Sequence, residues 1–127
     1  AKDLQKFKQN DSFQKLVLGF KRVSNILSKE KNFGTIDENL FEDKAETKLF
    51  TSINNTKAII EPLLTEKKYI EIMNFLVEMR EDIDELFDNV MINTKNVSLK
   101  KNRYNLLFEI RKMFLQVADI SKIVVEL

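Results

Sequence analysis

The residues of this sequence that could take part in chemistry are cations and amides at helical spacing. Lys15, Arg22 and Lys29 recur every seven residues, with Asn25 beside them. Seven residues are about two helical turns, so these side chains form one ridge along a helix face. Such a ridge suits the binding of phosphate groups. The alternative is an ordinary solvated face, which charge patterns of this kind usually form.

Further cations stand in the C-terminal part of the chain. Lys100 and Lys101 lie near the expected N-terminus of the last long helix, a position that favours phosphate. Residues 2–31 contain eight Lys or Arg against three Asp or Glu, residues 98–122 contain six against two, and residues 71–88 contain one against seven. If the first and last long helices lie side by side, they form one basic surface, and the middle helices form an acidic one.

The composition also excludes several kinds of chemistry. The chain has no His and no Cys, which removes the commonest general base, the commonest metal ligand and the thiolate nucleophile. Gly19 and Gly34 stand alone, so there is no glycine-rich phosphate loop. We therefore expect that the chain does not catalyse a reaction by itself and has no cofactor of its own.

Length and composition predict an all-α fold. A chain of 127 residues, 43% hydrophobic and 32% charged, fits one compact domain with its core at about residues 12–123. Two glycines and one proline are too few for the turns of a β-sandwich or barrel, so we expect a single bundle of four to five helices. No apolar run is long enough to span a membrane and no signal peptide is recognisable, so the expected location is cytoplasmic.

Apolar periodicity and caps predict where the helices lie. The first helix is expected to end near Lys31, with Gly34 left-handed in the loop that follows. Residues 36–41 are expected to form an ordered loop or one short turn. The expected caps are Asp11 or Ser12 for the first helix, Thr65 for the third and Asn96 or Ser98 for the last.

Two breaks are expected in the middle of the chain. A helix that begins near Asp43 should end or kink near Ile60, because Pro62 has no backbone donor. The next helix would be long for a domain of this size if it were unbroken, so a bend is expected near Arg80.

The last long helix carries two polar residues on its apolar stripe. Asn102 and Arg103 stand where a structural helix would have Leu or Ile, so both need partners on the core side. Asp84 and Asp88, four apart on the preceding helix, are the nearest acceptors in sequence. We expect Arg103 to bond one or both of them.

Several segments resemble one known family. FDNVM at 87–91, LKKNRYNLLFEIRKMF at 99–114 and VADISKI at 117–123 are similar to the C-terminal end of the beta subunit of bacterial tetrameric glycyl-tRNA synthetase. RVSNIL at 22–27 and IDENLFE at 36–42 extend the match. Together these segments run from about residue 20 to about residue 123 in family order.

The resemblance implies an anticodon-binding domain, mostly helical and similar to the DALR-type domain that ends arginyl-tRNA synthetase. This chain would then be a fragment of a larger beta subunit, which recognises glycine tRNA and works with an alpha subunit as a glycine–tRNA ligase. ATP and magnesium would belong to the whole enzyme. The sequence departs from the family pattern at Asp82, where Pro is usual, and at Lys100, where Arg is usual; a lysine lacks the bidentate fork of an arginine.

Charge and resemblance together give the candidate RNA-binding residues, which are Lys15, Lys21, Arg22, Asn25, Lys29, Lys100, Lys101, Arg111 and Lys112. Asn25, Asn89, Asn105 and Tyr104 are weaker candidates for base contacts. Phe33 is either a stacking platform or, more often for a Phe after a helix end, a hydrophobic closure of the loop.

One alternative belongs to a different functional class. The chain could be a helical protein-interaction module without RNA binding, docking a partner through its acidic middle helix or through Leu18 and Ile26. If the first helix is covered on more than one side, Arg22 and Asn25 would form structural bonds.

Overall fold

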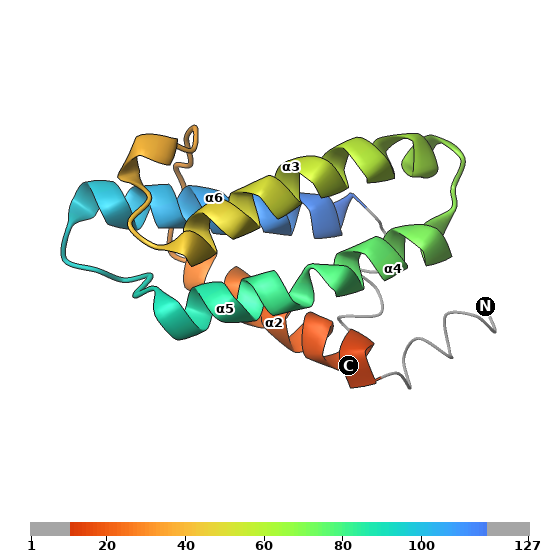
Figure 1. Cartoon of the computed structure of the whole chain (residues 1–127), viewed down its shortest axis with the longest axis horizontal. Coiled ribbons are helices and arrows are strands. Elements are labelled where there is room, and N and C mark those ends of the chain that lie inside the picture. The colour runs from red at the N-terminus through yellow and green to blue at the C-terminus, as the bar shows by residue number, and fades with distance from the viewer. Residues whose placement is uncertain (1–10, 117–127) are drawn as a thin grey trace.

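The computed structural model describes residues 11–116, and within them every regular element is helical (Figure 1). The elements are α2 (Asp11–Leu27), the 3-10 turn η1 (Glu38–Leu40), α3 (Lys44–Thr65), α4 (Tyr69–Glu78), α5 (Arg80–Asn89) and α6 (Val97–Leu115). The predicted all-α bundle is therefore confirmed. None of the described helices combines the length and apolar character that crossing a membrane requires.

Helix α6 is the central element. Residues 102–107 are all buried, and six consecutive residues point around the whole circumference of a helix, so α6 is covered on every side there. The rings of Phe20 and Phe114 lie 4.8 Å apart, near the C-terminal end of α6, whereas Lys29 lies near Lys100 at its N-terminal end. Helices α2 and α6 are therefore antiparallel neighbours, which confirms that the first and last long helices lie side by side.

Helix α3 begins with a capping box. The Asp43 side chain accepts a hydrogen bond from the Ala45 N–H at 2.9 Å, and Glu46 Oε1 accepts from the backbone N–H groups of Glu42 and Asp43 at 2.9 and 3.2 Å. One stripe of this helix is buried; it consists of Ala45, Leu49, Ile53, Thr56 and Ile60.

The end of α3 differs from the prediction. The helix does not end near Ile60 but continues through Pro62 to Thr65. Pro62 lies in the last turn, so the helix loses only the backbone hydrogen bond from residue 62 to the carbonyl of Ala58. Because Ala58 is exposed, water can bind that carbonyl. Thr65 is therefore not the cap of the next helix. That position belongs to Lys68, which makes no side-chain cap bond.

Two further loop predictions are wrong. Helix α2 ends at Leu27, earlier than Lys31, and no glycine among the described residues has a positive φ. Gly34 is held by a side chain instead: its N–H donates to Asn105 Oδ1 at 2.9 Å. Among the described residues, positive φ occurs at Lys67, with φ 59°, two residues after the end of α3.

Other local predictions are confirmed. η1 is the expected short turn, and Asn96 caps α6 by accepting from the Leu99 N–H at 3.1 Å. The helix breaks at Met79, close to Arg80, although Asp82 stands where the family usually has Pro. Asp82 instead accepts a hydrogen bond from the Ser52 hydroxyl at 2.7 Å, which ties α5 to α3.

The predicted partners of Arg103 are wrong. Its guanidinium donates to Glu42 Oε1 at 3.0 Å and to the Met91 carbonyl at 2.8 Å, and its Nε lies 3.5 Å from Glu46 Oε2. Asp84 pairs with Arg80 instead, at 3.3 Å, and Asp88 is exposed. Helix α5 turns Ile83 and Leu86 to the core, so its aspartates point elsewhere, and carboxylates at the start of α3 reach Arg103.

The two buried asparagines of α6 bind the loop between α2 and η1. Asn102 accepts from the Asp37 N–H at 2.7 Å and donates to the Asp37 carbonyl at 2.9 Å. Asn105 accepts from Gly34 and donates to the Thr35 carbonyl at 3.2 Å. The backbone of residues 34–37 thus satisfies both amides, and both fix the loop against α6.

An ion pair near the C-terminal end of α6 also joins α6 to α3. The ammonium of Lys57 donates to the carboxylate of Glu109, which also accepts from Lys112 at 2.9 Å. Partial burial raises the pKa of Glu109, but the hydrogen bonds and charges of the two lysines lower it by more, so the net pKa lies below its usual value.

We expect Arg103→Met to destabilise the fold strongly. The substitution leaves the fully buried Glu46 carboxylate without its cation, and breaking a buried pair costs about 3–5 kcal/mol. Urea unfolding followed by circular dichroism measures the loss. The control, Lys101→Met at the exposed neighbouring position, should change the free energy of unfolding by about 0.5 kcal/mol or less. Equal free energies of unfolding of the two variants would contradict the role of Arg103 as the cation that pairs with buried Glu46.

The pKa of Glu109 predicts a pH effect. Because its folded-state pKa is lowered, its ionised form stabilises the fold above its usual pKa, and this contribution is lost as pH falls through the folded-state pKa. Lys57→Met should raise the Glu109 pKa, as measured by NMR titration, and should reduce the loss of stability on acidification. Lys44→Met, at an exposed position, should leave the Glu109 titration unchanged.

Candidate nucleic-acid interface

A pocket lies where the end of α2 meets the first turns of α6. We call it the α2–α6 pocket; it has a volume of about 420 Å³ and is lined by Asn25, Ile26, Lys29, Glu30, Asn93, Lys100 and Tyr104. Because α2 and α6 are antiparallel, the C-terminal end of the first reaches the N-terminal end of the second. The pocket therefore brings Lys100 next to Asn25 and Lys29, two candidates that are far from it in sequence.

The polar groups of the α2–α6 pocket differ in what they already bind. Within residues 14–116, the side chains of Asn25 and Lys29 make no hydrogen bond or ion pair. The Lys100 ammonium lies 5.6 Å from the ring centroid of Tyr104, whose hydroxyl donates to Asn93 Oδ1. The pocket thus offers two ammonium groups and one amide to a ligand, beside a tyrosine that is fixed in place.

An aromatic cluster continues along α6 from this pocket. Phe108 follows Tyr104 by one turn, and the ring of Phe33 stacks on it with centroids 4.2 Å apart and planes 4° from parallel. The Arg111 guanidinium lies 5.4 and 5.5 Å from the two ring centroids, and the Lys112 ammonium lies 4.9 Å from that of Phe108. Phe33 packs against the core, which confirms the interpretation of this residue as a loop closure.

Ion pairing separates the cations of this chain into two groups. Lys48, Lys57, Lys112 and the buried Arg103 each pair with a carboxylate of the domain. Among residues 14–116, no carboxylate lies within ion-pair distance of a second group of cations, which includes the candidates Lys21, Arg22, Lys29, Lys100, Lys101 and Arg111. The charge of these candidates is therefore available to an external anion.

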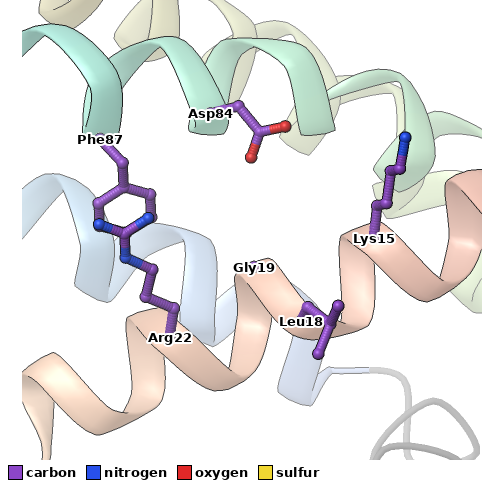
Figure 2. A pocket seen from close by; sticks show the side chains of 6 residues that line it. All are labelled: Lys15, Leu18, Gly19, Arg22, Asp84 and Phe87. Carbon is purple, nitrogen blue, oxygen red and sulfur yellow. The ribbon is translucent and has the colours of Figure 1, made fainter.

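The ridge on α2 does not form one continuous basic surface. Lys15 and Arg22 line a second pocket with Leu18, Gly19, Asp84 and Phe87, of about 230 Å³, between α2 and the acidic helix α5 (Figure 2). Figure 2 shows Arg22 reaching to Phe87, while Asp84 points toward the space between the helices. The Arg22 guanidinium lies 4.1 Å from the ring centroid of Phe87. Lys29 lies beyond the end of α2 at Leu27 and lines the α2–α6 pocket instead.

The remaining candidates are spread over the surface. Lys101 is exposed on the first turns of α6, and Lys21 lines a shallow pocket on α2 with Gln14, Val17 and Leu18. Asn89 donates to the Glu85 carbonyl, and Asn105 holds the 34–37 loop, so both amides have local partners. Glu30 and Asn93 of the α2–α6 pocket were missed, since neither belongs to a pattern that signals binding.

Known proteins are similar to nearly the whole chain. The family model described as the DALR anticodon binding domain matches residues 16–124. The glycine–tRNA ligase beta subunit of Geotalea daltonii is 33% identical over 120 residues, which are 94% of this chain and 17% of that protein. The beta subunit of Pseudomonas fluorescens is 40% identical over 103 residues, which are 80% of this chain and 15% of that protein.

The beta subunit of Vibrio campbellii is 37% identical over 123 residues, which are 95% of this chain and 18% of that protein. The chain thus spans less than a fifth of the length of these relatives. The resemblance drawn from residues 87–91 and 99–114 is confirmed. Sequence and helical architecture agree that this chain belongs to the DALR anticodon-binding domain family.

Proposed function

We propose that this domain binds the anticodon arm of glycine tRNA and so positions the tRNA for aminoacylation. The observation that carries the proposal is the α2–α6 pocket, where Lys29, Lys100 and Asn25 meet and neither lysine has a carboxylate partner within residues 14–116. The similar proteins of Geotalea and Pseudomonas are glycine–tRNA ligase beta subunits, which supports glycine tRNA as the substrate.

Phosphate contacts supply most of the proposed affinity. The unpaired lysines around the α2–α6 pocket neutralise backbone phosphates and release their counterions, which makes binding dependent on salt. Lys101 and Arg111 extend the same cationic region along α6. Lys112 contributes less, because its ammonium is shared with Glu109 at 2.9 Å.

Base contacts supply the selectivity. Proteins read unstacked RNA bases by stacking on aromatic or guanidinium planes and by hydrogen bonds to base edges. Arg111, packed beside the stacked rings of Phe33 and Phe108, offers a guanidinium plane farther along α6. Asn25 offers an amide inside the pocket itself.

The chemical step belongs to the rest of a full-length enzyme. In this proposal the domain is part of a cytoplasmic glycine–tRNA ligase, in which a longer beta subunit and an alpha subunit supply the site for ATP, magnesium and glycine. Its own role is binding, so its residues act on the position of the tRNA.

A second candidate function is a protein-interaction module. Leu18 is 64% exposed on α2, between the pocket shared with α5 and the shallow pocket near Lys21. An apolar side chain between two hollows could contact a partner protein. Such a partner would depend on Leu18 and not on the lysines of the α2–α6 pocket.

Charge reversal distinguishes the two functions. We expect Lys29→Glu with Lys100→Glu to weaken binding of a glycine tRNA anticodon stem-loop about tenfold or more, and to lower the slope of log K against log salt by about 1 for each lost phosphate contact. Fluorescence anisotropy across a salt series measures both. Lys68→Glu, at the α3–α4 turn at the other end of the bundle, is the control and should change neither value (Figure 1).

Two outcomes would contradict the proposal. One is an affinity for the glycine stem-loop no greater than that for a scrambled loop at every salt concentration. The other is equal binding by the doubly reversed variant and the Lys68→Glu control, which would favour the protein-interaction module.

A further inference from the structure

The α2–α6 pocket has the size of a small-molecule site. Its volume of about 420 Å³ lies within the range of about 300–1,000 Å³ that is typical of ligand pockets. Its walls come from the end of α2, the α5–α6 loop and the first turns of α6. An extruded nucleotide can therefore enter it, whereas a base-paired helix cannot.

One wall of the pocket is rigid. Tyr104 is 9% exposed, and its hydroxyl is bonded to Asn93 in the loop before α6. The loop is held in turn by Arg103, which donates to the Met91 carbonyl at 2.8 Å. The pocket therefore exists before a ligand arrives, which lowers the entropic cost of binding.

The polar groups of the pocket divide by charge and by hydrogen-bonding capacity. Lys29 and Lys100 are cations suited to a phosphate, whereas the carboxamides of Asn25 and Asn93 can both donate and accept. Glu30 adds a carboxylate that accepts from the backbone of Lys31 at 3.2 Å and keeps further acceptor capacity. The Glu30 carboxylate only accepts, so it favours a ligand group with N–H donors, and either carboxamide can complement such a group.

We propose that the α2–α6 pocket holds one unpaired nucleotide of the bound RNA, with its phosphate on Lys29 and Lys100 and a base that carries an exocyclic amino group against Asn25, Asn93 and Glu30. Adenine, cytosine and guanine have such a group and uracil does not. The inference rests on the proposed RNA-binding function and adds to it a base-selective subsite.

Asn25 is the cleanest position at which to test the subsite. Its side chain makes no hydrogen bond within residues 14–116, and it lies exposed in the last turns of α2, so Asn25→Ala removes a ligand contact and leaves the fold intact. Asn74→Ala, at an exposed position of α4, is the matched control.

The experiment is a double-mutant cycle between protein and RNA. Each unpaired base of a fluorescein-labelled glycine tRNA anticodon stem-loop that carries an amino group is replaced in turn by uracil, and the Kd is measured with the wild-type chain, Asn25→Ala and Asn74→Ala. We expect one RNA position at which the change to uracil raises the Kd about tenfold for the wild-type chain and for Asn74→Ala. For Asn25→Ala, the same change should raise the Kd about threefold or less. Urea midpoints of the three proteins should agree.

Two results would overturn the inference in different ways. If the stem-loop binds and depends on Lys29 and Lys100, but uracil carries the same penalty in Asn25→Ala and wild type at every position, the base-selective subsite is wrong and RNA binding stands. If the wild-type chain binds no stem-loop at low salt, the proposed function is wrong and the subsite is wrong with it.

Discussion

The structure depends on a strip of polar side chains inside its central helix. Asn102, Arg103 and Asn105 lie on α6 where the surrounding elements exclude water, and each satisfies backbone or carboxylate groups of another segment. A buried polar group without a partner costs about 1–3 kcal/mol, so this arrangement is stable only when the loop and the start of α3 are in register with α6. The strip therefore specifies how the connection after α2 runs.

The geometry of the candidate interface follows from that constraint. The 34–37 loop, held by both asparagines, places the ring of Phe33 on Phe108 and the guanidinium of Arg111 beside them. Arg103 fixes the carbonyl of Met91 and with it the loop that carries Asn93 to Tyr104. The α2–α6 pocket is thus shaped by residues that never touch its interior.

Charge is used in two ways in this domain. Some cations join helices, as Lys57 does between α3 and Glu109 of α6, and their charge is neutralised within the fold. Others, such as Lys29 and Lys100, have no carboxylate partner among residues 14–116 and keep their charge for an external anion. A net charge of +1 therefore conceals a local excess of cations whose charge is not neutralised within the described residues.

By itself, the sequence determined the helical class, the cap at Asn96 and the family, because these follow from composition, local capping and shared residues. Only the tertiary structure decided the partners of Arg103, since Glu42 and Glu46 are distant in sequence and Asp84 merely closer. It likewise separated Lys15 and Arg22 from Lys29, because α2 ends at Leu27 and Lys29 lies in the turn beyond it, so the helical spacing does not extend to this residue.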